Sequence, residues 1–167
     1  MDYLAGDWQA QLAVLARVAF AAVLGGLVGL EREIAARPAG LRTNMLLCAA
    51  AALLVAISDL LAERFASEHY APLVRVDPVR VIEAVVTGVA FLGAGTIFRR
   101  GGDMVTGLTT AASMLLVAAI GVVVGLGQHV LAVGAAVLAL AVLRGLAALE
   151  LRAAHSARRP PSKTPAD

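Results

Sequence analysis

Long apolar stretches separated by short polar segments follow one another along the chain. A membrane-spanning helix needs about 20 mostly apolar residues. Five stretches reach or approach that length, at residues 12–30, 41–61, 79–98, 105–125 and 130–149. A turn signal at 125–129 divides the last two stretches, which predicts two helices joined by a tight hairpin. We therefore expect an all-α integral membrane bundle of five transmembrane helices in residues 1–157, with a disordered cytoplasmic tail at 158–167.

Composition supports a membrane protein and excludes several other classes. Of the 167 residues, 60% are apolar and 16% are charged, whereas a soluble domain carries about 25% charged residues. Mean hydropathy is +0.83. Aromatic residues make up only 4% of the chain and its basic residues are scattered, so we expect no nucleic-acid partner and the lipid bilayer as the main environment.

Catalytic and metal-binding patterns are not found in the sequence. It holds no Ser–His–Asp arrangement, phosphate loop or nucleotide fingerprint, which predicts that the chain is not an enzyme. The three histidines are far apart, and a zinc or haem site is not expected. The single cysteine, Cys48, lies in an apolar run, where a buried thiol is the usual state.

The distribution of basic residues predicts the orientation of the helices. Ten of them fall on one side, namely Arg32, Arg37, Arg42, Arg99, Arg100, Arg144, Arg152, Arg158, Arg159 and Lys163. Only three fall on the other side, all between residues 64 and 80. Because cytoplasmic loops carry the excess of Lys and Arg, we expect the N-terminus outside and the C-terminus in the cytoplasm.

Two parts of the chain are similar at a separation of 67 residues. Gly40-Leu41-Arg42-Thr43 resembles Gly107-Leu108-Thr109-Thr110, and no gap is needed over positions 17–57. We predict two parallel helical-hairpin repeats, from the first four helices, and a fifth helix outside them. A pseudo-two-fold axis along the membrane normal would relate the repeats. The alternative is similar composition among unrelated membrane helices.

Polar residues gather at the predicted cytoplasmic end of the first hairpin, where side chains near lipid are costly. Glu31 stands at the membrane boundary, and Arg42 begins the second helix. The carboxylate could bind a cation such as Mg²⁺, with oxygen donors from Thr43 and Asn44. The alternative is that Glu31 pairs with Arg42 and holds the loop in place.

The corresponding turn of the second hairpin carries Thr109 and Thr110. Their hydroxyls could join the same ion site, or they could cap the free N–H groups of the helix. Two helix N-termini would meet at this surface, each with a partial positive charge. That arrangement favours an anion or the Glu31 carboxylate over a bare cation.

Further charged residues lie on the opposite side. Asp77 before Pro78 is typical of a helix N-cap, with metal binding as the alternative. Arg80 can pair with Glu83 three residues later. By the repeat, Arg17 lies at the depth of Glu83, and we predict an intramembrane ion pair between them because an unpaired charge is costly in lipid.

Small residues mark the predicted helix–helix contacts, because they let backbones approach closely. The glycines expected at such contacts are Gly25, Gly29, Gly88, Gly93, Gly95, Gly121 and Gly125. Alternatively, Gly93 and Gly95 could expose backbone carbonyls along a pathway.

The ordered set of motifs resembles the MgtC/SapB family of bacterial membrane proteins over roughly residues 14–125. The matching segments are Gly29-Leu30-Glu31-Arg32-Glu33, Ala39-Gly40-Leu41-Arg42-Thr43, Asp77-Pro78-x-Arg80, Gly88-x-x-Phe91-Leu92-Gly93-Ala94-Gly95 and Gly107-Leu108-Thr109-Thr110-Ala111-Ala112. Virulence-associated members carry a soluble C-terminal domain, and some have asparagine in place of Thr109 and cysteine in place of Leu116. Functions tied to those features are not expected here.

The resemblance implies a protein of the bacterial inner membrane linked to magnesium homeostasis, with no cofactor and with Mg²⁺ as the candidate ligand or substrate. Some members are implicated in restraining ATP synthase. Magnesium transport is one expected function. The alternative is a non-transporting subunit that regulates another membrane complex, such as an ATP synthase or a cation pump. Because five helices make a small bundle, we also expect a homodimer.

Overall fold

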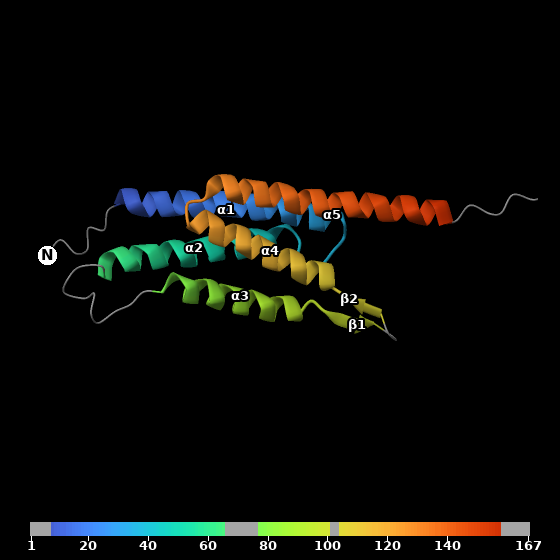
Figure 1. The fold of residues 1–167 in the computed structure, drawn as a ribbon, viewed down its shortest axis with the longest axis horizontal. Coiled ribbons are helices and arrows are strands. Elements are labelled where there is room, and N and C mark those ends of the chain that lie inside the picture. The colour runs from blue at the N-terminus through green and yellow to red at the C-terminus, as the bar shows by residue number, and fades with distance from the viewer. Residues whose placement is uncertain (1–7, 66–76, 101–103, 158–167) are drawn as a thin grey trace, which may run out of the picture.

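The computed structural model describes residues 8–65, 77–100 and 104–157, and within them the chain is helical apart from one short ribbon. The elements are α1 (Trp8–Ile34), α2 (Leu41–Phe65), α3 (Pro78–Ala94), β1 (Phe98–Arg100), β2 (Met104–Thr106), α4 (Leu108–Gly125) and α5 (His129–Ala157). Figure 1 shows α1, α3 and α5 running in one direction and α2 and α4 in the other. The expected bundle of five helices is confirmed, and the connections alternate between its two ends.

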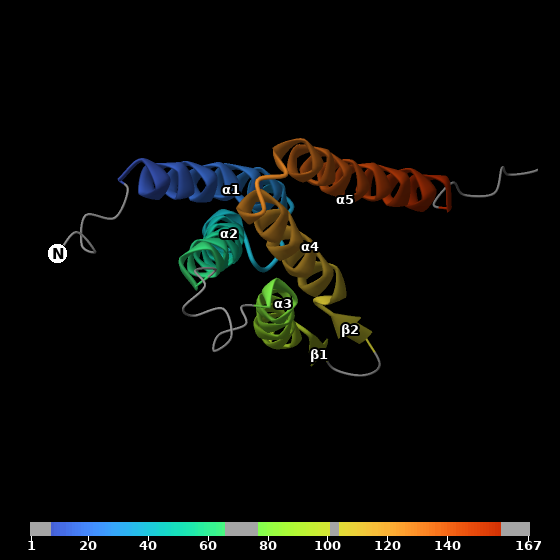
Figure 2. The same cartoon turned by 60° about the vertical axis from the view of Figure 1, so that its left-hand side comes forward.

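Helix α4 lies at the centre of the bundle and contacts each of the other four helices. Helices α2 and α4 each contact both α1 and α3, so they separate those two helices (Figure 2). The repeat itself and the homodimer stay predictions.

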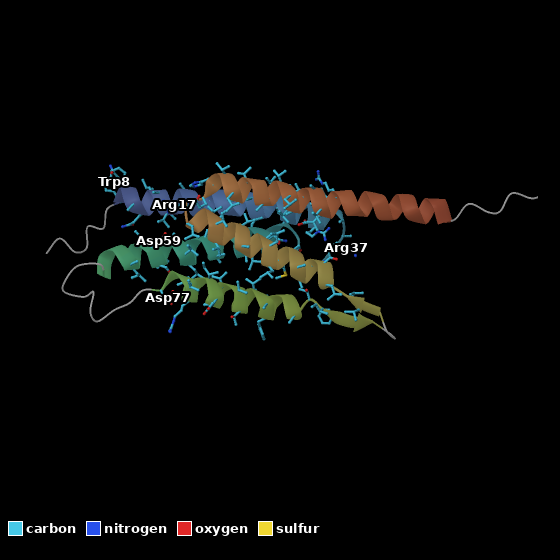
Figure 3. The ribbon with its side chains drawn as sticks, in the orientation of Figure 1. Trp8, Arg17, Arg37, Asp59 and Asp77 are labelled. Atoms are coloured by element: carbon cyan, nitrogen blue, oxygen red, sulfur yellow. The ribbon has the colours of Figure 1, made fainter. Side chains whose placement is uncertain are left out.

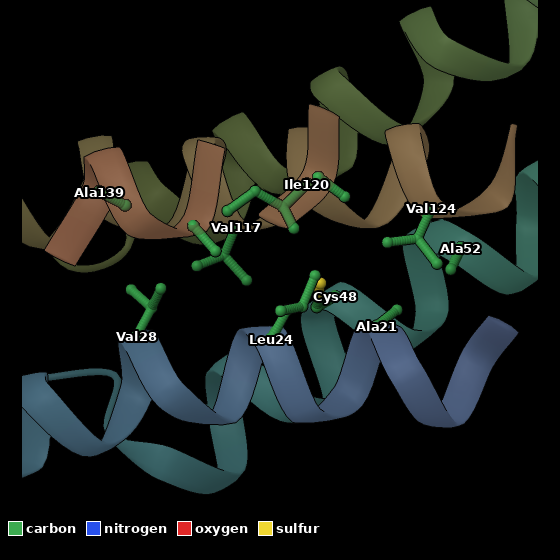
Figure 4. Close-up of a cluster of buried hydrophobic side chains, with 11 residues drawn as sticks. Ala21, Leu24, Val28, Cys48, Ala52, Val117, Ile120, Val124 and Ala139 are labelled. Atoms are coloured by element: carbon green, nitrogen blue, oxygen red, sulfur yellow. The ribbon is translucent and has the colours of Figure 1, made fainter. Parts of the chain in front are cut away.

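Two clusters of buried apolar side chains surround α4. The first joins Leu24 of α1, Cys48 of α2, Ile120 of α4 and Ala139 of α5, as Figure 4 shows. The second lies between α2, α3 and α4 and includes Met114. Because lipid is as apolar as these side chains, close packing rather than the hydrophobic effect holds such helices together.

Glycines allow the closest of these contacts. A Cβ atom added at Gly121 would collide with the carbonyl oxygen of Cys48, and one at Gly125 would lie 2.8 Å from that of Ala52. Gly25 and Gly29 similarly face the first turns of α2. These helix axes can approach only because the side chains are missing.

The remaining predicted packing glycines lie on α3 or directly after it. Gly93 faces Ala111 of α4. A Cβ atom added at Gly93 would lie 3.3 Å from the Cβ atom of Ala111. Nothing lies within 4 Å of such an atom at Gly88, and at Gly95 the nearest atoms belong to the last turn of α3 itself. Within the described chain, the contacts expected at Gly88 and Gly95 are therefore not formed.

Among the described residues, three helical stretches are long and apolar enough to cross a membrane, namely Trp8–Ile34, Leu41–Ala62 and Leu108–Gly125. The apolar part of α5, His129–Gly145, is shorter, and α3 has 17 residues, or about 26 Å of helix at 1.5 Å per residue. The predicted tail at 158–167 lies outside the described residues.

The end of the third apolar stretch and the start of the fourth differ from the prediction, since α4 begins at Leu108 rather than at residue 105. Helix α3 stops at Ala94 rather than at residue 98, because the N–H groups of Thr96 and Ile97 turn back to the carbonyls of Gly93 and Ala94. The chain then forms an antiparallel ribbon in which Phe98 is opposite Thr106. β-Branched residues such as Val105 favour this pleated conformation.

Candidate functional site

An inner pocket of about 710 Å³ opens where the α1–α2 connection, the β ribbon and the start of α4 meet. Its polar lining comes from Arg37, Thr96, Thr106, Thr109 and Thr110. Arg37 is the charged member of this lining. Figure 3 shows Arg37 at the opposite end of the bundle from Trp8 and Asp77. Two of the three threonines predicted for the ion site, Thr109 and Thr110, thus line a pocket whose charge is positive.

Gly107 sets the geometry at the start of α4. Its φ of +93° is left-handed, and a Cβ atom there would collide with the Thr96 carbonyl oxygen, so only glycine fits. No side chain of a described residue caps the helix, and the first backbone bond runs from Ala111 N–H to the Gly107 carbonyl at 2.9 Å. The three N–H groups before Ala111 therefore have no intrahelical partner.

The threonine hydroxyls around this helix start differ in their bonding. Thr106 donates to the Phe98 carbonyl at 3.2 Å, and Thr96 to that of Gly93 at 2.8 Å. Thr110 is 2% exposed as a residue and its carbonyl accepts from the Ser113 hydroxyl at 2.8 Å, while its own hydroxyl forms no hydrogen bond within the part of the chain that the structure describes. The capping role considered for Thr109 and Thr110 is not formed.

Arg37 is placed by the way that α1 ends. The Arg37 N–H donates to the Arg32 carbonyl at 2.9 Å, and the Ala36 N–H to that of Glu33 at 3.0 Å. This pair of bonds is a Schellman motif, which requires a left-handed residue after the helix. Ala36 supplies it with a φ of +52°. The motif turns the chain so that Arg37 lines the inner pocket.

Glu31 does not reach the pocket, and Arg42 is not its partner. Its carboxylate accepts two bonds from the neighbouring Arg32, from Nε to Oε2 at 2.7 Å and from Nη2 to Oε1 at 3.2 Å. Both residues are buried, at 6% and 4% exposure. The expected Glu31–Arg42 pair is corrected to Glu31–Arg32, and the paired guanidinium neutralises the carboxylate that was expected to bind a cation at this end of the bundle.

The start of α2 uses a different carboxylate. Glu33 Oε2 accepts from the Leu41 N–H at 2.8 Å and so caps this helix. Arg42 and Thr43 are exposed and lie outside the pocket lining. Asn44 is fully buried, and its amide donates to the carbonyl of Gly40 at 3.0 Å and to that of Ala39. The structure therefore divides the predicted ion site among several places.

The other end of the bundle holds Asp77 and Arg80. Asp77 accepts from the Val79 N–H at 3.0 Å ahead of Pro78, which is the predicted N-cap of α3. Arg80 lies 3.7 Å from Asp77 rather than pairing with Glu83, and both side chains of this pair are at least half exposed. These residues hold the start of α3 and are far from the inner pocket (Figure 3).

The predicted ion pair between Arg17 and Glu83 is not formed. Arg17 instead donates to the Gly125 carbonyl at 3.3 Å, while Glu83 is exposed on α3. Because α2 and α4 separate α1 from α3, the nearer acceptor is the carboxyl end of α4, which carries a partial negative charge. Arg17 and Asp59 also line an outer pocket of about 530 Å³ between α1 and α2 (Figure 3).

Three functional side chains were not singled out from the sequence. Glu33 caps α2, Arg32 neutralises Glu31 and Arg37 lines the inner pocket. From the sequence, we assign no partner or pocket to Arg32 and Arg37 and use their charges to predict the orientation of the helices. A carboxylate shortly before a predicted helix start would have indicated the cap. Among the described residues, no three His, Cys, Asp or Glu side chains come together as a metal site.

The MgtC family model matches residues 18–152 of the chain. The chain is 41% identical over 128 residues to the Escherichia coli protein named "Putative magnesium transporter YhiD", covering 76% of this chain and 57% of that protein. It is 32% identical over 123 residues to protein SapB of Bacillus subtilis, covering 74% of this chain and 52% of that protein. It is 41% identical over 120 residues to protein MgtC of Brucella abortus, covering 72% and 45%.

The chain therefore spans about half the length of the curated relatives that it matches. No solved structure matches it.

Proposed function

The chain belongs to the MgtC family of magnesium-related membrane proteins, and we propose that it regulates another membrane complex in magnesium homeostasis without carrying the ion itself. The observation that carries this proposal is the Glu31–Arg32 pair, whose two hydrogen bonds occupy both oxygens of the buried carboxylate. Mg²⁺ takes carboxylate and neutral oxygens in an octahedral arrangement with several waters. A carboxylate held by a guanidinium is a poor ligand for it.

The electrostatics of the inner pocket also support regulation. Its charged lining residue is Arg37, and the positive end of α4 faces it. Between the two ends, the apolar clusters around Ile120 and Met114 fill the interior of the bundle. We place the protein in the bacterial inner membrane with this pocket on the cytoplasmic side, because Arg32, Arg37 and Arg42 lie at this end.

Purified protein in liposomes with an internal magnesium-sensitive dye tests the proposal. We expect no Mg²⁺ flux above protein-free liposomes, in either direction and at any imposed membrane potential. In inverted bacterial membrane vesicles, added protein should lower ATP-driven proton pumping. The regulatory proposal would be overturned if the protein gave a Mg²⁺ flux that E31Q abolishes and had no effect on ATP-driven proton pumping.

Magnesium transport is the second candidate, and the two pockets at opposite ends of the bundle favour it. The outer pocket contains Asp59, whose carboxylate forms no salt bridge within the described residues, and the inner pocket lies at the other end of the same helices. Transport predicts that D59N stops the flux in the liposome assay. The matched control is D77N, because Asp77 is an exposed cap at the same end of the bundle.

A further inference from the structure

We propose that the inner pocket binds a phosphate group, held by the free N–H groups of α4, the Thr110 hydroxyl and the Arg37 guanidinium. The proposal concerns a ligand of the cytoplasmic surface and holds for either candidate function. Its ligand is a phosphate monoester or diester, either on a soluble molecule or on a lipid headgroup.

The open start of α4 is the first reason. A helix N-terminus carries about half a positive charge and presents N–H groups to an anion. Here Gly107 offers no side chain to occupy those groups. Helix α4 has 18 residues, which is long enough to develop the full dipole.

Within the same molecule, the start of α2 shows what such a helix end binds. There the Glu33 carboxylate accepts from the Leu41 N–H at 2.8 Å. The segment Gly40-Leu41 corresponds to Gly107-Leu108 at a separation of 67 residues, and the same separation places Arg100 where Glu33 would stand. Among the described residues, no carboxylate fills the second helix start as Glu33 fills the first, and an external anion can take that place.

The unpaired Thr110 hydroxyl is an independent reason. Thr110 lines the pocket and is 2% exposed as a residue, and its hydroxyl forms no hydrogen bond with any described residue. An anion oxygen in the pocket would accept a hydrogen bond from this hydroxyl.

Arg37 selects phosphate among anions. Its guanidinium forms no salt bridge with a described carboxylate, and its fork of N–H donors matches two phosphate oxygens. No carboxylate lines the pocket, so a cation finds no opposite charge among the described lining residues. The volume of about 710 Å³ exceeds that of a bare ion and suits a phosphate with an attached organic group.

Titration of the full chain in a neutral, phosphate-free detergent tests the proposal. The probes are inorganic phosphate, ATP and short-chain phosphatidic acid, each at constant ionic strength and measured by isothermal titration calorimetry. We expect at least one probe to bind, with R37Q and T110V each weakening its affinity by roughly tenfold or more. T110S keeps the hydroxyl and should retain most of the affinity.

The matched controls are R42Q and T43V, which remove a similar charge and hydroxyl from exposed positions at the same end of the bundle. Both should bind as tightly as the unaltered protein. Equal losses in R37Q and R42Q would mean attraction to a basic surface and would overturn the proposal, as would the failure of all three probes to bind. Preference for phosphatidic acid indicates a lipid headgroup, and preference for ATP or inorganic phosphate indicates a soluble ligand.

Discussion

The end of α1 offers a sharp test of the geometry that positions Arg37. Ala36 stands at φ +52° in the Schellman motif after α1, where glycine is the usual residue. The motif after α4 has the same two bonds, from Gly127 N–H to the Val124 carbonyl at 2.9 Å and from Gln128 N–H to that of Val123 at 3.0 Å. There the left-handed residue is Gly127, at φ +75°.

The expected effect follows from this difference. An L-residue in the left-handed region costs about 1–2 kcal/mol, and A36G removes that cost. The greater conformational freedom of glycine in the unfolded chain offsets about 0.4–1 kcal/mol of that gain in folding stability. Ala36 is exposed, so little packing is lost. We therefore expect A36G to stabilise the protein by about 1 kcal/mol, or about 2–4 °C in melting temperature for a chain of this size.

The reciprocal variant G127A should lower the melting temperature by a similar amount. An added Cβ atom at Gly127 would lie 3.9 Å from the nearest atoms, those of the Arg17 guanidinium, which is an ordinary contact. The loss would therefore come from backbone conformation and not from a collision.

The single cysteine provides the assay. Cys48 is fully buried between α2 and its neighbours, so a thiol-reactive fluorophore labels it when the bundle unfolds on heating. A36G should delay labelling to higher temperature, and G127A should advance it. If A36G lowers the midpoint temperature of labelling while G127A leaves it unchanged, then Ala36 does not have the left-handed conformation after α1. The placement of Arg37, which depends on that conformation, would then be wrong as well.

Three further predictions use the same thermal assay. G121A should destabilise the protein by about 1–3 kcal/mol, because the added Cβ atom collides with the α2 backbone. G88A should be neutral or stabilising, because nothing described lies within 4 Å of a Cβ atom at that position. Equal effects of the two variants would contradict the packing of α4 on α2. D77A should cost about 1 kcal/mol through loss of the cap on α3, and an unchanged midpoint would contradict that cap. R17Q should destabilise the protein by about 1 kcal/mol through the lost hydrogen bond to the Gly125 carbonyl of α4, whereas E83Q should not. Energetic coupling between the two variants in a double-mutant cycle would show instead that Arg17 and Glu83 form an ion pair.

The number of helices and the cap at Asp77 could be predicted because both are local. An apolar run of sufficient length predicts a helix whatever it packs against. The β ribbon could not be predicted this way, because Phe98, Met104 and Val105 are as apolar as the helices that they follow or precede. Hydropathy does not distinguish a short strand from the last turn of a helix.

Partners of charged residues were harder to predict, because they depend on which helices are neighbours. The sequence suggested Arg42 for Glu31 and Glu83 for Arg17 from depth and spacing alone. In the structure Glu31 is satisfied by the adjacent Arg32, and Arg17 by a backbone carbonyl of α4. A backbone acceptor leaves no signal in the sequence, and the order of helices around α4 decides which carbonyls are within reach.

The two ends of α4 explain how a ligand in the inner pocket would affect the whole bundle. At its carboxyl end, the Gly127 motif and Arg17 satisfy the last carbonyls, while at its amino end, after Gly107, no described side chain caps the N–H groups. Because α4 contacts every other helix, an anion at the open end stabilises the element on which all of them pack. A ligand that binds only the folded state at 100 times its dissociation constant adds about 2.7 kcal/mol. That exceeds the gain expected from A36G, so a bound phosphate group would change the stability of the bundle more than this substitution does.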